Sequence, residues 1–191
     1  LCVSGLIGSV HSLQWNVLQF MGVDNKFNQT LWRNQNEYPG GYVMDGGVHF
    51  VHGLQMIAGP VTSLVAKTKS VNPLLGTMDM GFALLTHASG VISSLNMGWQ
   101  HGDEEEHLKV FGTEGTLIIK EKEILHLRTD GTQNTYALVE TDTFLEEWKD
   151  FYSAIQGISS LDLVQRDVVR DVQIIEGIIR SADEGKEIFI D

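Results

Sequence analysis

The chain has 191 residues and a formal net charge of −12 at pH 7, which argues against nucleic acid and anionic membrane surfaces as partners because both are recognised by basic patches. Its length suits one domain, expected over residues 1–191, and no apolar run reaches the roughly 18 residues of a membrane span. A single cysteine, Cys2, excludes an internal disulfide and is typical of a cytoplasmic protein. The start lacks the basic segment of a signal peptide, so we expect a fragment of a longer protein.

The first half of the chain predicts a strand, a long loop and a helix. Residues 8–20 are rich in alternating and aromatic side chains and predict the strand. Residues 21–40 carry Asn, Gln, Gly and Pro and predict the loop. Residues 45–58 have an apolar face with helical period, ended by a Gly-Pro pair. That face is formed by Phe50, Leu54 and Ile57.

Residues 61–139 change to the period of a strand. Between residues 91 and 99 the odd positions are mostly apolar, which predicts the buried face of a strand. Short segments separated by glycine turns give about six strands by this pattern, joined closely enough for antiparallel pairing. The acidic run "HGDEEEH" at residues 101–107 is interpreted as a solvated loop between two of them. An alternative is that Trp99 ends its strand facing a pocket.

The last third predicts two helices. Residues 143–158 have an aromatic face that includes Trp148 and is expected in the core, with Thr143 and Glu146 as a capping box. Residues 162–182 predict the second helix. The predicted fold class is therefore α+β: one large, mostly antiparallel sheet with helices packed on one face.

The segment "YPGGYVMDGGVHFVHG" at residues 38–53 carries the most chemistry. Asp45 and His49 are one helical turn apart, where a carboxylate can orient an imidazole that passes a proton. The neighbouring glycines would let a ligand approach the backbone. The spacing alone favours a structural interpretation, in which Asp45 caps the helix and His49 is a satisfied core residue.

His52 extends the pattern to D-x3-H-x2-H, which could bind a metal. A metal site usually needs a further ligand, and the spacing selects none from the candidates. These are His87, His101, His107 and Glu104 to Glu106. No metal site is therefore predicted.

The ordered series of motifs resembles the C-terminal domain of the Gfo/Idh/MocA oxidoreductases. The longest part is "WRNQNEYPGGYVMDGGVHFVHGLQMIAGPV" at residues 32–61, which is similar to the W-R, GG-x-x-x-D-x-x-x-H and G-x-V elements of that family. "FGTEGTL" at 111–117 and "IIRSADEGKEIFI" at 178–190 continue the likeness. The resemblance covers nearly the whole chain, and the D-x-x-x-H part alone is only moderately specific.

The resemblance implies an enzyme that transfers hydride between NAD or NADP and a sugar, polyol or aldehyde. The cofactor would bind mainly to an N-terminal Rossmann domain that this chain lacks, so this fragment alone should be inactive. His49 would be the general acid/base and Asp45 its catalytic or positioning partner. The substrate would contact Trp32, Arg33, Gly41 and Trp99. The open face of the sheet would form a homo-oligomer.

Two alternatives stay open beside the enzyme. A non-catalytic ligand-sensing or regulatory protein could keep the same fold, although retained Asp45 and His49 favour catalysis. A metal-dependent hydrolase using Asp45, His49 and His52 is weaker. His52 stands where many family members have Asp, and we expect it to tune the pocket.

Overall fold

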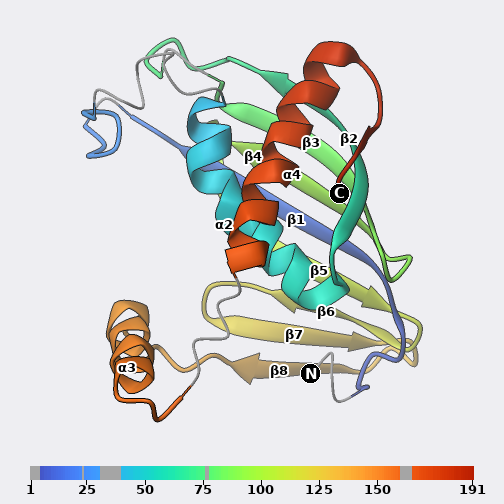
Figure 1. Ribbon diagram of the computed structural model, residues 1–191. Coiled ribbons are helices and arrows are strands. Elements are labelled where there is room, and N and C mark those ends of the chain that lie inside the picture. Colours follow the sequence, from blue (N-terminus) through green and yellow to red (C-terminus); the bar gives the residue numbers. More distant parts are fainter. Residues whose placement is uncertain (1–4, 23, 31–39, 76–77, 160–164) are drawn as a thin grey trace.

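The computed structural model describes residues 5–22, 24–30, 40–75, 78–159 and 165–191. Nine strands form one sheet in the order β8-β7-β6-β5-β1-β4-β3-β2-β9 (Figure 1). Among the described pairs only β1 and β4 run parallel. The strands are β1 Val10–Phe20, β2 Val61–Lys69, β3 Met80–His87, β4 Ile92–Gly98, β5 Gln100–Gly112, β6 Gly115–Ile119, β7 Glu123–Arg128, β8 Gln133–Ala137 and β9 Ile188–Phe189.

The helices of the described residues are α2 Gly41–Ala58, α3 Thr143–Ile155 and α4 Gln165–Glu184. Helices α2 and α4 lie side by side across one face of the sheet, over the half that contains β2, β3 and β4 (Figure 1). Their apolar side chains meet the alternate residues of β1 and β4, and these side chains form the core. The predicted α+β class is confirmed, as is the buried face of the segment 91–99.

The acidic run was wrongly predicted to be a loop. Residues 100–112 form the single long strand β5, which pairs with β1 on one side and β6 on the other. The β6 pairing covers only Leu108–Gly112, so backbone pairing with β1 holds the charged part of this segment as a strand. Val17 lies opposite Glu106 in the β1–β5 register, so alternation sends the carboxylate of Glu106 to the same face as Val17.

Helix α3 differs from the prediction in its cap and in its packing. Asp142, not Thr143, caps the helix, because its Oδ1 accepts a hydrogen bond from the backbone N–H of Leu145 at 3.1 Å. The aromatic face is not core: Trp148 is 67% exposed and α3 stands apart from the sheet (Figure 1). An amphipathic sequence shows that a helix has a face to bury, but it does not identify the surface that covers that face.

On the other face of the sheet, no helix of the described residues covers β2, β3 and β4, and this face is apolar there. Leu84 and Ile92 are each 54% exposed on this face, with Val65 and Phe82 beside them. No helix of the described residues is long and apolar enough to cross a membrane.

Candidate functional site

Helix α2 begins four residues earlier than the sequence predicts. Gly40 is its N-cap at φ 96° and Gly41 follows at φ 46°, both in the left-handed region that glycine tolerates. No side chain caps this end. Asp45 therefore lies in the second turn of α2, and the interpretation of Asp45 as a helix cap is wrong.

Asp45 and His49 line the same hollow, which has a volume of about 250 Å³. Asp45 is partly buried and the imidazole of His49 is exposed. Trp99 and Tyr42 form an aromatic wall, with ring centroids 6.1 Å apart. The remaining lining residues are Gln19, Met21, Phe27, Gly46 and Phe50. A carboxylate, an imidazole and two aromatic rings thus face one space.

The glycines of α2 also serve packing, and the expectation that Gly46 and Gly47 admit a ligand stays a prediction. A Cβ at Gly46 would lie 2.8 Å from Cζ2 of Trp99, and one at Gly47 would lie 2.7 Å from Cδ1 of Ile175. A third glycine, Gly53, meets the indole ring of Trp15 in the same way. The helix can approach the sheet and α4 closely because these positions lack side chains.

His52 faces α4 and does not line either of the two hollows described here. Its Nδ1 lies 2.8 Å from Oδ2 of Asp171, whose Oδ1 accepts a hydrogen bond of 2.8 Å from Nε2 of Gln55. His52 therefore joins two helices, and the expectation that it tunes the pocket is not supported by its position. Among the described residues no group of three His, Cys, Asp or Glu side chains could hold a metal ion.

The candidate ligand His87 is also satisfied within the protein. Its Nδ1 lies 2.7 Å from the carbonyl oxygen of Gly59, to which it donates, and its Nε2 accepts from the hydroxyl of Ser93 at 2.8 Å. Burial lowers the pKa of His87, and the hydrogen bond to Gly59 offsets part of that effect. This imidazole is a neutral link between β3, β4 and the end of α2.

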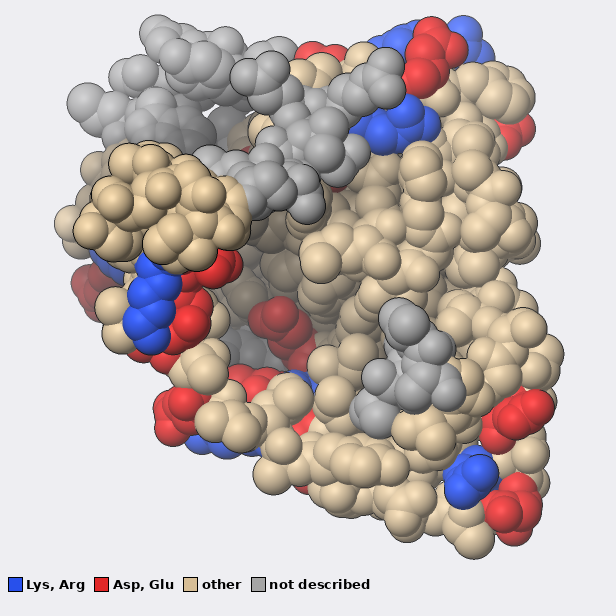
Figure 2. All heavy atoms as spheres, turned by 60° about the horizontal axis from the view of Figure 1, so that its bottom comes forward, with Lys and Arg blue, Asp and Glu red and all other residues tan. Residues whose placement is uncertain are grey.

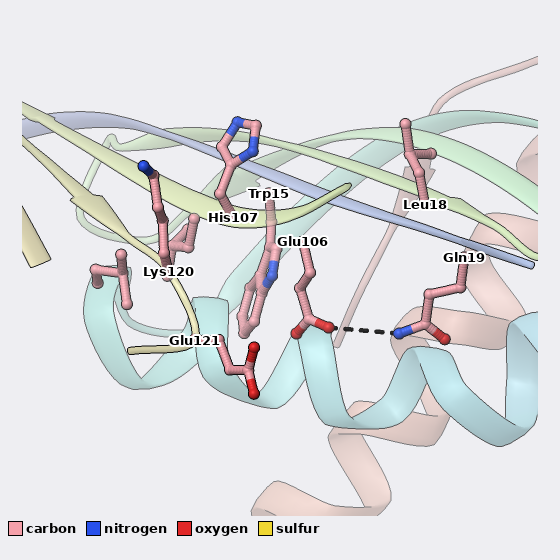
Figure 3. Close-up of a pocket in the computed structure, with 9 residues that line it drawn as sticks. Trp15, Leu18, Gln19, Glu106, His107, Lys120 and Glu121 are labelled. Atoms are coloured by element: carbon pink, nitrogen blue, oxygen red, sulfur yellow. Dashed lines mark hydrogen bonds between the residues drawn. The ribbon is translucent and has the colours of Figure 1, made fainter. Parts of the chain in front are cut away.

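A larger hollow of about 690 Å³ adjoins the first. Gln19 lines both, and its Nε2 lies 3.4 Å from Oε2 of Glu106. Figure 3 shows Trp15, Gln19, Glu106 and Glu121 pointing to the side on which α2 lies. In Figure 2 this face of the molecule is hollowed, and acidic side chains lie within the hollow.

Sequence reasoning missed this larger hollow because its residues are far apart along the chain. Pairing of β1 with β5 sets Trp15 opposite Leu108, and pairing of β5 with β6 sets Leu108 opposite Ile119. The only signal in the sequence was the alternation within each strand, which gives the face of a side chain but not its neighbours.

Of the four predicted substrate-binding residues, the structure describes Gly41 and Trp99. Trp32 and Arg33 lie outside the described residues. Gly41 opens α2 but is not among the residues that line either hollow. Trp99 is buried beside Asp45 and His49, and its part in substrate binding stays a prediction.

The family model of the GFO/IDH/MocA C-terminal domain matches residues 1–118. An uncharacterised protein of Saccharomyces cerevisiae is 33% identical over 116 residues, which are 59% of this chain and 33% of that protein. The D-apiose dehydrogenase of Paraburkholderia graminis is 29% identical over 136 residues, which are 68% of this chain and 36% of that enzyme.

Solved structures extend the likeness over the whole fold. An oxidoreductase from Thermotoga maritima superposes with a TM-score of 0.89 at 26% identity, covering 98% of this chain and 56% of that one. Levoglucosan dehydrogenase in complex with NADH and levoglucosan gives a TM-score of 0.83 at 18% identity, covering 99% of this chain and 60% of that one. The chain therefore spans little more than half of the solved proteins that share its fold.

Proposed function

Because the chain belongs to the Gfo/Idh/MocA family as a C-terminal domain, we propose that it is the substrate-binding and catalytic half of an NAD(P)-dependent oxidoreductase. The reaction moves a hydride between nicotinamide and a sugar, polyol or aldehyde. The observation that carries the proposal is that Asp45 and His49 line one hollow with Trp99. Dehydrogenases of D-apiose and levoglucosan among the similar proteins support a sugar-like substrate.

The side chains that line the smaller hollow fit the substrate of such an enzyme and not the pyrophosphate of its cofactor. They comprise an imidazole, a carboxylate and aromatic rings, with no Lys or Arg among the described lining residues. A dinucleotide pyrophosphate needs backbone N–H groups or cations, so we assign it to a nucleotide-binding domain outside this chain. This fragment alone is then inactive. When bound, NAD or NADP supplies or accepts the hydride.

The protein's own contribution is the proton. His49 lies at the open side of α2, where its exposed imidazole can reach a substrate oxygen. During reduction His49 donates a proton to the carbonyl oxygen, and during oxidation it removes the proton from the hydroxyl. Asp45 is four residues earlier on the same helix face, where its carboxylate can help to position the imidazole and the substrate. The aromatic wall limits access of water on one side.

The test uses a protein that joins this chain to its nucleotide-binding domain. Oxidation of NADH and NADPH is measured with a panel of sugars and aldehydes, and reduction of NAD+ and NADP+ is measured with a panel of sugars and polyols. Turnover with at least one of them is the expected result. Tight cofactor binding without turnover would instead support the ligand-sensing or regulatory alternative.

We also propose a cytoplasmic location and a homo-oligomer formed through the open sheet face.

A further inference from the structure

We propose that the larger hollow binds the remote hydroxyl groups of the substrate, and that Glu106 and Glu121 select an uncharged polyhydroxyl compound over a sugar acid or a sugar phosphate. This inference rests on the proposed function, because it takes the reacting carbon to lie beside His49. The hollow lies within the size range of small-molecule sites, roughly 300–1,000 Å³, at about 690 Å³.

The two hollows adjoin each other. Gln19 lines both of them. The ring of Trp15 in the larger hollow lies 5.3 Å from the ring of Phe50 in the smaller one, at an interplanar angle of 71°. We take a molecule whose carbonyl group is near His49 to extend along Gln19 into the larger hollow.

The groups of the larger hollow suit a polyhydroxyl compound. Trp15 and Leu108 offer apolar surface for the C–H face of a sugar ring. Gln19 and Glu106, with their side-chain atoms 3.4 Å apart, offer an amide and a carboxylate side by side. Hydroxyl groups both donate and accept hydrogen bonds, so one sugar can satisfy both side chains. Glu121 adds a second carboxylate on the same side (Figure 3).

The charges within the hollow are negative. Lys120 and His107 also border it, but Figure 3 shows both pointing away from Trp15 and Glu121. The ammonium of Lys120 lies 3.2 Å from Oε1 of Glu123, its ion-pair partner. A carboxylate or phosphate of a ligand would thus meet Glu106 and Glu121 without a compensating cation from the described lining residues. Like charges brought together in this way exclude a ligand that is otherwise well matched.

The test is a titration of the 191-residue chain followed by the NMR signals of the tryptophan indole N–H groups. The probes are neutral compounds (D-glucose, D-xylose and sorbitol) and their carboxylate counterparts (glucuronate, xylonate and gluconate). The variant Trp15→Phe assigns the Trp15 signal. A neutral probe should shift that signal and leave that of Trp148 on α3 unchanged. The matching acid should give the same shift only at about tenfold higher concentration, which is the effect of one or two nearby like charges.

Removal of the two charges gives the decisive comparison. The double variant Glu106→Gln with Glu121→Gln should bring the affinities for acid and neutral compound together. The control Glu140→Gln with Glu187→Gln changes the net charge equally on exposed residues outside the hollow, and it should preserve the difference.

The inference fails if no neutral probe shifts Trp15, if the acids bind as well as the neutral compounds, or if both double variants behave alike. These outcomes are separate from the test of the proposed function. Turnover without a Trp15 response would refute the subsite alone. A Trp15 response in a protein that never turns over would refute the oxidoreductase alone.

Discussion

Nδ1 of His52 lies 2.8 Å from Oδ2 of Asp171, so the third member of the D-x3-H-x2-H pattern faces helix α4. The carboxylate of Asp171 is buried and also accepts from Gln55. The pattern that the sequence presents as one unit is therefore divided. Asp45 and His49 face the hollow, and His52 joins two helices.

This division predicts a stability role for His52. The variant His52→Ala removes one partner of a buried carboxylate and should lower the free energy of unfolding by about 1–3 kcal/mol. Urea unfolding of His52→Ala, Asp171→Asn and the double variant measures the coupling between them. We expect a coupling energy above about 0.5 kcal/mol. Additive effects of the two substitutions would show that the contact contributes nothing.

The buried His87 predicts that stability depends on pH. Its pKa is lowered by burial, so the unfolded chain binds the proton more readily than the folded protein. The stabilising contribution is complete above the unfolded pKa of about 6.5 and is lost as the pH falls toward the folded pKa. The free energy of unfolding should therefore decline as the pH is lowered from 7.5 to 5. Binding of one proton can change it by at most about 1.4 kcal/mol per pH unit.

The variant His87→Asn should remove this part of the decline. The control is His11→Asn, which changes an exposed imidazole and should leave the pH profile as it is in the parent chain. If the parent chain and His87→Asn lost stability equally as the pH fell, the assignment of this loss to His87 would be contradicted.

The close packing of α2 predicts different costs for two neighbouring glycines. Alanine is the better helix former, but the added methyl group of Gly46→Ala meets the rigid indole of Trp99. We expect Gly46→Ala to destabilise by about 1–3 kcal/mol, the usual cost of overpacking. Gly47→Ala first meets the flexible end of Ile175 and should cost less. Thermal unfolding of both variants ranks them, and the reverse order would contradict this packing account.

The open sheet face predicts self-association. Leu84 is exposed at its centre between Phe82 and Ile92, and burying such side chains against a second copy is favourable at about 25 cal/mol per Å². Light scattering should show an oligomer for the parent chain and a monomer for Leu84→Lys. The control Met56→Lys changes an exposed apolar residue on α2 and should still associate. A parent chain that stays monomeric at high concentration would exclude this interface.

The sequence was sufficient for some elements and not for others, for physical reasons. The alternation of residues 91–99 predicted the buried face of β4 because a half-buried strand has a period of two. The charged run containing Glu106 gave no such signal, and only pairing with β1 makes it a strand that lines a hollow. Trp148 shows the same limit for helices, since its apolar face is evident while its partner surface is not.

At the candidate site, the turn spacing of Asp45 and His49 correctly predicted one shared face. The packing role of the glycines was not predicted, because a missing Cβ can admit either a ligand or a neighbouring side chain. The sequence does not distinguish these two uses, whereas the structure shows the indole ring of Trp99 beside Gly46.

The most direct test of the central claim is the turnover of His49→Ala beside that of His52→Ala, in the protein that joins this chain to its nucleotide-binding domain. The two histidines lie three residues apart on one helix, but only His49 lines the hollow. With both variants confirmed as folded by circular dichroism, His49→Ala should lose about 10²–10⁴-fold in kcat, the usual contribution of general acid–base catalysis. His52→Ala should keep kcat within about threefold of the parent value, because it loses no catalytic proton donor. Equal turnover of His49→Ala and the parent protein would contradict the proposed role of the hollow.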